Sequence, residues 1–74
     1  MKKLPSFTPK SLIRILLRKG FVLDRTKGSH HIYIHHSTGQ RVVIPMHNKD
    51  IPKGTFWSIL KQADISKEEL EDLF

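Results

Sequence analysis

The sequence predicts an α+β fold, a two-layer sandwich in which a three-stranded antiparallel sheet carries helices on one face. Apolar residues recur at helical spacing in 9–19 and again in 55–63, near the two ends of the chain. The middle of the chain, 21–44, instead holds three short β-rich runs separated by glycine-containing turns. A chain of 74 residues has room for one small core, so residues 1–74 are expected to form a single domain.

The first helix has clear signals at both ends. Thr8 is a good N-cap, and Pro9 suits the first helical position, where its missing N–H leaves no hydrogen bond unmade. The helix is expected to run to about Lys19 and to stop at Gly20, because glycine readily adopts the left-handed conformation that ends many helices. An apolar stripe at helical spacing is expected to face the core and comprises Leu12, Ile15 and Leu16.

Three runs of residues after this helix are typical of β-strands. They cover residues 21–27, 30–36 and 41–44. Gly28 breaks the first run from the second, and residues 37–40 have the composition of a turn. Pro45 terminates the third strand or confines it to an edge of the sheet. The short connections predict antiparallel pairing.

Alternation along the second strand divides its side chains into two sets. One set is Ile32 and Ile34 with His30 and His36; the other is His31, Tyr33 and His35. The two isoleucines are expected to point at the core, which leaves Tyr33 on the exposed face. There the Tyr33 ring is a candidate for stacking on a nucleic-acid base, and a cross-strand aromatic contact is an equally good interpretation.

Two helices are expected in the last third of the chain. After a loop over 46–54, Thr55 can cap a helix whose apolar stripe comprises Phe56, Ile59, Leu60 and Ala63. Ser66 and Glu69 have the spacing of a capping box, which predicts a short last helix over 67–73.

Positive charge is concentrated in the first part of the chain. Residues 1–53 hold eleven Lys or Arg side chains against two carboxylates, for a net charge of +9, whereas 54–74 hold two Lys against five carboxylates, for −3. The basic part is a candidate nucleic-acid face. The alternative is that the charge serves solubility alone.

The sequence contains no cysteine, so disulfides and thiolate metal sites are excluded and a reducing compartment is favoured. No apolar run has the length of a signal peptide or of a membrane span, so a cytoplasmic protein is expected.

The tetrapeptide Gly28-Ser29-His30-His31 is the strongest candidate for a site. Glycine allows backbone to approach a bulky ligand, and imidazole side chains exchange protons near neutral pH. Backbone N–H groups of the turn and the Ser29 hydroxyl can hold a phosphate. Three nearby cations suit the same ligand: Arg25, Lys27 and Arg41. Periodicity leaves the choice between His30 and His31 open.

Other histidines have competing interpretations. His47 follows the third strand in a loop, where functional residues are common, and is a third candidate. One alternative for the histidine cluster is a zinc-like metal site, but adjacent strand residues point to opposite faces and no Cys or Glu lies nearby at ligand spacing, so three convergent ligands would require His47 to come close. The plainest alternative is that most of these histidines are half-exposed strand residues without a role. His35 and His36, beside the turn, are interpreted as half-exposed strand residues without a role.

Three separated elements recur in a characteristic order: Gly28-Ser29-His30-His31-Ile32-Tyr33, then Arg41-Val42-Val43-Ile44-Pro45-Met46-His47, then Lys53-Gly54-Thr55 with Ile59-Leu60-Lys61-Gln62-Ala63. Together these elements resemble the HicA toxin family. The similarity covers about residues 8–65. It implies an α-β-β-β-α fold similar to double-stranded RNA-binding domains, and it implies an mRNA interferase, an endoribonuclease of a toxin–antitoxin system.

The resemblance also implies roles for particular residues. The family's catalytic histidine corresponds to His30, with His31 as runner-up because some members keep only the second histidine. The proline-then-histidine element corresponds to Pro45 and His47, although Met46 stands where a basic residue is usual. The implied reaction uses the ribose 2′-OH and no metal or cofactor.

Two partners follow from the resemblance: mRNA as substrate, and a HicB-type antitoxin that masks the active site. The competing function is a non-catalytic RNA-binding module of the double-stranded RNA-binding-domain type, for which the basic face alone would suffice.

Overall fold

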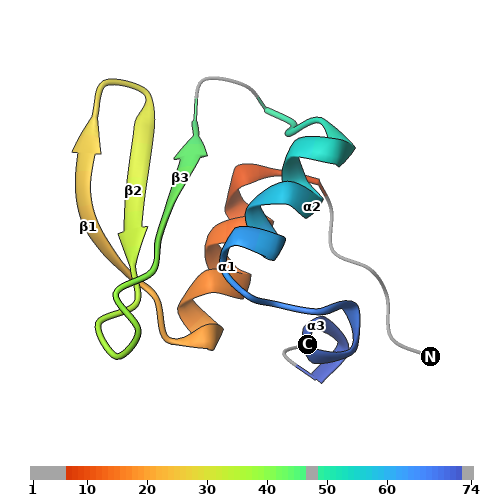
Figure 1. Ribbon diagram of the computed structural model, residues 1–74. Helices are drawn as coiled ribbons and strands as arrows, with labels where there is room; N and C mark the ends of the chain where they lie inside the picture. Colours follow the sequence, from red (N-terminus) through yellow and green to blue (C-terminus); the bar gives the residue numbers. More distant parts are fainter. Residues whose placement is uncertain (1–6, 47–48, 73–74) are drawn as a thin grey trace.

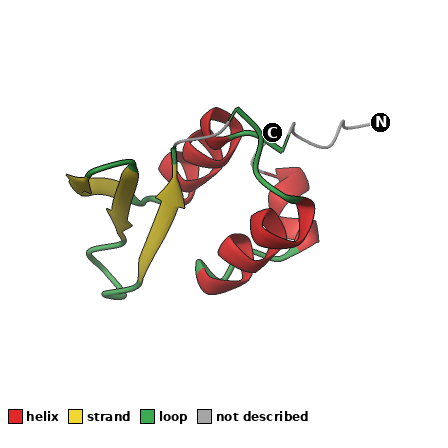
Figure 2. Cartoon of the chain, turned by 90° about the horizontal axis from the view of Figure 1, so that it is seen from above, coloured by secondary structure: helices red, strands yellow, loops and turns green. Residues whose placement is uncertain are grey.

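The computed structural model describes residues 7–46 and 49–72, which form helices and strands in the order α-β-β-β-α-α (Figure 1). The elements are α1 (Pro9–Lys19), β1 (Val22–Lys27), β2 (His30–Ile34), β3 (Arg41–Pro45), α2 (Lys53–Gln62) and α3 (Lys67–Asp72). The strands make one antiparallel sheet in the order β1-β2-β3. Seen from above, the strands occupy one side of the molecule and the helices the other, which confirms the predicted α+β class (Figure 2).

Helix α1 begins and ends as its sequence predicts. The Thr8 hydroxyl accepts a hydrogen bond from the N–H of Ser11 at 3.2 Å. At the other end Gly20 has φ 109°, and its N–H donates to the carbonyls of Leu16 and Leu17. These two caps satisfy backbone groups that a helix end leaves without partners, so local sequence alone determines the length of α1.

The prediction of which β2 face is buried was wrong. Tyr33 is 5% exposed and lies in the core, whereas Ile32 and Ile34 are only half-buried on the opposite face. The cross-strand register explains the reversal, because Tyr33 pairs with the buried Val42 and His31 pairs with the buried Ile44. Paired residues point to the same side of a sheet, so the apolar alternation of β3 decides the face for β2.

Two boundaries also differ from the prediction. Strand β2 ends at Ile34 rather than His36, because the His35 carbonyl accepts hydrogen bonds from the N–H groups of Thr38 and Gly39 and so already belongs to a turn. Helix α2 begins at Lys53, with Thr55 inside its first turn rather than at the cap. The N–H of Phe56 donates to the Pro52 carbonyl at 2.9 Å, which closes a helical turn before Thr55 can cap one.

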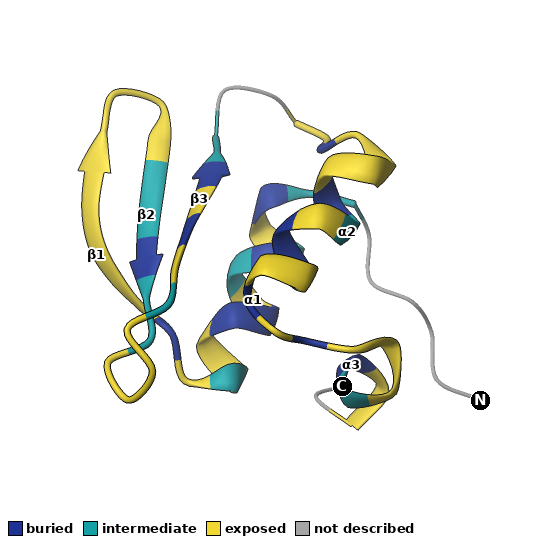
Figure 3. Ribbon diagram, viewed as in Figure 1, coloured by how far each residue is buried: buried dark blue, intermediate teal, exposed yellow. Residues whose placement is uncertain are grey.

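The core lies between the sheet and the helices, and exposure rises away from it (Figure 3). The predicted stripes of α1 and α2 are buried: Leu12, Ile15, Leu16, Phe56, Ile59, Leu60 and Ala63. At α3 the Ser66 hydroxyl accepts from the N–H of Glu69 at 3.1 Å, as the capping spacing predicts. The last described residue of α3 is Asp72, and residue 73 of the predicted helix lies outside the described part. By contrast, all six residues of β1 are exposed.

Candidate functional site

A two-residue turn joins β1 to β2. Lys27 and His30 are partners in the register, and only Gly28 and Ser29 lie between them. Gly28 has φ 61°, while Ser29 is not among the residues with positive φ; glycine at the first central position is the pattern of a type II′ turn. A Cβ at Gly28 would meet nothing within 4 Å, so backbone conformation rather than space requires glycine here.

The tip of this hairpin is attached to the end of β3. The Ser29 carbonyl accepts a hydrogen bond from the N–H of Met46 at 2.7 Å. In the same row of the sheet, Pro45 pairs with His30 on the side opposite Lys27. The tip therefore has backbone contacts on both sides of β2, and His30 lies in the middle of the row.

His30 and His31 have opposite surroundings, as adjacent residues of a strand do. His30 is exposed on the side of the sheet turned away from the helices. His31 is half-buried on the helix side, where its Nδ1 is buried and has no hydrogen-bond partner among the described residues. A ligand that approaches the sheet from outside meets His30 first.

We define the open face as the side of the sheet that the helices do not cover. Its three rows follow the register. They are Lys27, His30 and Pro45 at the tip; Arg25, Ile32 and Val43 in the middle; and Val22, Ile34 and Arg41 at the far end. Val43 is 46% exposed beside Ile32 in the middle row, so the centre of this face has accessible apolar surface, and Val22 in the far row is 42% exposed. Each row also holds a basic side chain.

Asp24 is a site residue that the sequence analysis missed. It has no partner in β2, because the register shifts between Leu23 and Arg25, which is the pattern of a β-bulge. Its carboxylate accepts hydrogen bonds from Nε of Arg25 at 3.2 Å and from Nη1 of Arg41 at 3.1 Å. The sequence did carry a signal for this residue: Asp24 is one of only two acidic residues in the basic first part of the chain, where a carboxylate is surrounded by possible cationic partners.

The two arginines keep donors for a ligand. Their side chains are 65% and 55% exposed for Arg25 and Arg41, respectively. Each guanidinium has five N–H donors, and a single hydrogen bond from each is directed at Asp24. Arg41 reaches Asp24 from β3 across β2, so both guanidinium groups lie over the open face.

The structure separates the remaining predicted residues from this face. Tyr33 lies in the core, so its predicted role in stacking on a base was wrong; burial raises the pKa of its phenol, which keeps the ring neutral. His47 lies outside the described residues. His35 packs edge-on against Phe21, with 5.1 Å between ring centroids, and His36 is exposed in the following turn. Within 7–46 and 49–72, no three His, Asp or Glu side chains come together as a metal site would require.

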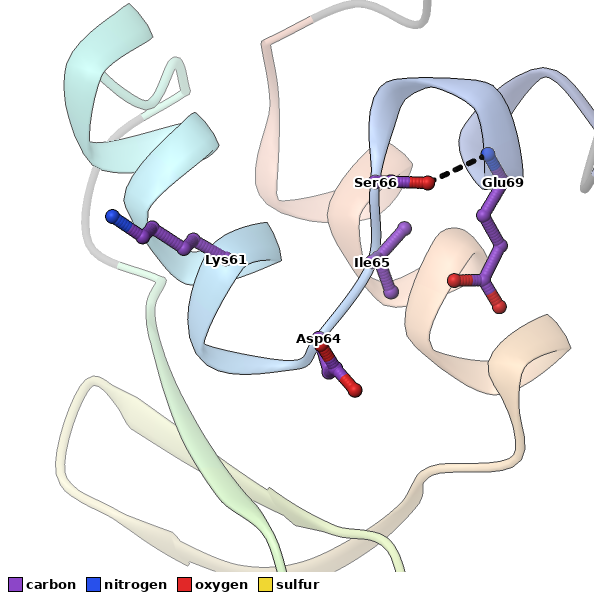
Figure 4. Close-up of a pocket in the computed structure, with 5 residues that line it drawn as sticks. All are labelled: Lys61, Asp64, Ile65, Ser66 and Glu69. Atoms are coloured by element: carbon purple, nitrogen blue, oxygen red, sulfur yellow. Dashed lines mark hydrogen bonds between the residues drawn. The ribbon is translucent and has the colours of Figure 1, made fainter.

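A hollow lies at the junction of α2 and α3, away from the predicted site residues (Figure 4). It is lined by Lys61, Asp64, Ile65, Ser66 and Glu69. Glu69 is ion-paired with Lys19 of α1, and Ser66 caps α3, so these side chains have structural partners. None of the predicted site residues lines this hollow.

The chain matches the model of a known protein family. None of the helices in the described ranges is both long and apolar enough to span a bilayer. No curated protein matches the chain. A family model described as the HicA toxin of bacterial toxin–antitoxin systems matches residues 9–65, a range that runs from α1 through the hairpin and β3 to just past the end of α2. Since this match covers well over half of the chain, the protein belongs to the HicA toxin family.

Proposed function

We propose that this toxin is a metal-independent endoribonuclease that cleaves mRNA and uses His30 as its catalytic histidine. The observation that carries the proposal is the exposure of His30 on the open face, with Lys27 paired beside it and Arg25 in the next row. A group that exchanges a proton next to two cations suits a phosphodiester, because the cations balance the negative charge of the reacting phosphate.

Acid–base catalysis is enough for this reaction, because the nucleophile and the leaving group both belong to the RNA. The ribose 2′-oxygen attacks the adjacent phosphorus while the P–O5′ bond breaks, which leaves a 2′,3′-cyclic phosphate and a 5′-hydroxyl. In one such step His30 either accepts the proton of the 2′-OH or donates a proton to the departing O5′, and water or a second group performs the other transfer. Lys27 and Arg25 stabilise the charge that develops on the phosphate oxygens.

The hairpin turn supplies further contacts to the phosphate. Ser29 is exposed beside His30, so its hydroxyl can donate to a phosphate oxygen. Gly28 holds the turn and leaves open space above it, which allows a bulky backbone to approach. We assign these two residues to substrate binding, with Arg41 as a contact in a more distant row.

His31 is the competing catalytic residue, and its surroundings disfavour it. Its side chain is half-buried toward the helices, with one ring nitrogen enclosed. A substrate phosphate would have to enter beneath the sheet to reach it, away from Lys27 and Arg25.

The nuclease proposal is tested by incubating purified toxin with labelled single-stranded RNA, with DNA of the same sequence, and with RNA in the presence of a chelator. We expect scission of RNA in both RNA samples and an intact DNA strand, because DNA lacks the 2′-OH. RNA that is bound but never cut would instead support the non-catalytic RNA-binding module.

The toxin pairs with an antitoxin, as members of toxin–antitoxin systems do, and we propose a HicB-type antitoxin for this role. The basic character of residues 1–53 suits an acidic partner that covers His30 and excludes RNA. Co-expression with such a partner is expected to abolish cleavage of the labelled RNA.

A further inference from the structure

We infer that the open face is a track for single-stranded RNA, on which the strand runs from the hairpin tip toward the far row. This inference rests on the proposed function, because it extends the site of His30 to the nucleotides next to the scissile phosphate. It commits the toxin to one substrate class, an extended single strand rather than a duplex.

The spacing of the rows supports an extended strand. Residues on one face of a strand recur every second position, about 7 Å apart, so His30, Ile32 and Ile34 span about 13 Å. The spacing between rows is of the order of the distance between successive phosphates in an extended chain. Each row contributes one cation, in the order Lys27, Arg25 and Arg41 from the tip.

The apolar centre of the face explains why a single strand is favoured. Ile32 and Val43 form the middle row together with Arg25, and Val43 is 46% exposed. An accessible aliphatic surface of this kind gains from covering an unpaired base, whose faces are apolar. In a duplex the bases are stacked inside and present only their edges, so the aliphatic side chains would remain uncovered.

Asp24 sets the positions of the cations in the middle and far rows. By accepting from both Arg25 and Arg41, it holds their guanidinium groups over the face before RNA binds. Two guanidinium groups against one carboxylate leave a net positive charge, and each group keeps further N–H donors. The middle and far rows, each with one arginine, continue directly from the tip, so one RNA strand can contact His30 and all three cations at once.

The experiment measures binding of 2′-O-methyl oligoribonucleotides of two, four and six nucleotides, which cannot be cleaved. We expect affinity to rise from two to four nucleotides. Arg41→Ala and Val43→Ser are each expected to weaken tetranucleotide binding about tenfold while leaving the dinucleotide unchanged. The controls are Arg14→Ala and Leu17→Ser on α1, which remove an exposed cation and an exposed apolar side chain outside the sheet and are expected to have no effect.

Several results would overturn the track. They are affinity independent of oligonucleotide length, tighter binding of duplex than of single strand, or a Val43→Ser variant that loses the antitoxin but keeps full RNA affinity. Because the oligonucleotides are uncleavable, these results are separate from the nuclease test. A toxin that binds the series as expected but never cuts RNA would keep the track and lose the proposed reaction.

Discussion

At the scale of single residues, neighbouring side chains of β2 differ in exposure and therefore in their expected roles. His30 is exposed on the open face, whereas Tyr33, on the other side of β2, is 5% exposed and belongs to the core. His31 shares the side of Tyr33 and is half-buried. Substitutions of Tyr33 and His31 are therefore expected to change stability, and substitutions on the open face are expected to change binding and cleavage.

Burial of Tyr33 predicts a loss of stability in alkaline solution. Because its pKa is raised above the ordinary value of 10.0, the unfolded chain releases the phenol proton first, and the free energy of unfolding falls as the pH rises through that value. Tyr33→Phe is expected to lose less stability than the wild type between about pH 9 and pH 11. Urea unfolding at each pH measures this, and equal losses in the two proteins would contradict it.

Asp64 has φ 61°, in the left-handed region that L-residues rarely adopt. It follows the last turn of α2, where the N–H of Ile65 reaches the carbonyl of Leu60. Asp64→Gly is expected to stabilise the fold by about 0.5–1 kcal/mol, because glycine takes this conformation without strain. Asp64→Ala is the matched comparison and is expected to destabilise it. Thermal unfolding that ranks alanine equal to glycine would refute the argument.

At the scale of elements, the β1–β2 hairpin depends on its turn. Gly28→Ala is expected to destabilise the fold by about 1 kcal/mol, because φ at Gly28 is 61°. Gly54→Ala is the control, since Gly54 lies in α2 without a positive φ and with nothing within 4 Å of an added Cβ; it is expected to be neutral or stabilising. Denaturant unfolding compares the two, and equal effects would contradict the assigned role of the turn.

The elements differ in how far their sequence predicts them. Helix α1 was predicted at both ends because its caps, Thr8 and Gly20, act through local backbone hydrogen bonds. The face of β2 was predicted wrongly, because alternation defines two sets of side chains and only the pairing of Tyr33 with Val42 decides which set is buried. The bulge at Asp24 was missed for the same reason, since it exists only relative to the partner strand.

The candidate site likewise has one part that the local sequence predicts and one part that depends on the pairing of distant strands. Gly28 and His30 lie together because they are nearly adjacent in the chain, and a two-residue turn is enough to bring Lys27 beside His30. The row that Arg41 occupies depends on the pairing of β3 with β2, and its hydrogen bond to Asp24 crosses the whole sheet. No pattern within one strand carries that information.

At the scale of the whole molecule, the side of the sheet without helices is also the side that carries basic residues. The helices lie on one side of the sheet and leave the other to solvent (Figure 2). The register places the basic residues of β1 and β3 on that open side. The acidic helix α3 lies on the helix side and pairs with α1 through Glu69 and Lys19. The open face therefore remains available to a polyanion.

This arrangement predicts a defined salt dependence of RNA binding. Contacts from Arg25, Lys27 and Arg41 would release counterions from a single strand, so log affinity is expected to fall against log salt concentration with a slope of about −2. Titration of an uncleavable oligonucleotide at several salt concentrations measures the slope. Arg14→Ala is expected to leave it unchanged, and a slope near zero would exclude phosphate contacts as the source of affinity.

The central claim is that His30 presents its imidazole to bound RNA on the open face. The most direct test compares the cleavage rates of His30→Ala and His31→Ala on the same labelled single-stranded RNA, with the fold of each variant checked by denaturant unfolding. We expect His30→Ala to remain folded and to lose cleavage, and His31→Ala to be less stable but to retain cleavage while folded. Full cleavage by a folded His30→Ala variant would contradict the claim.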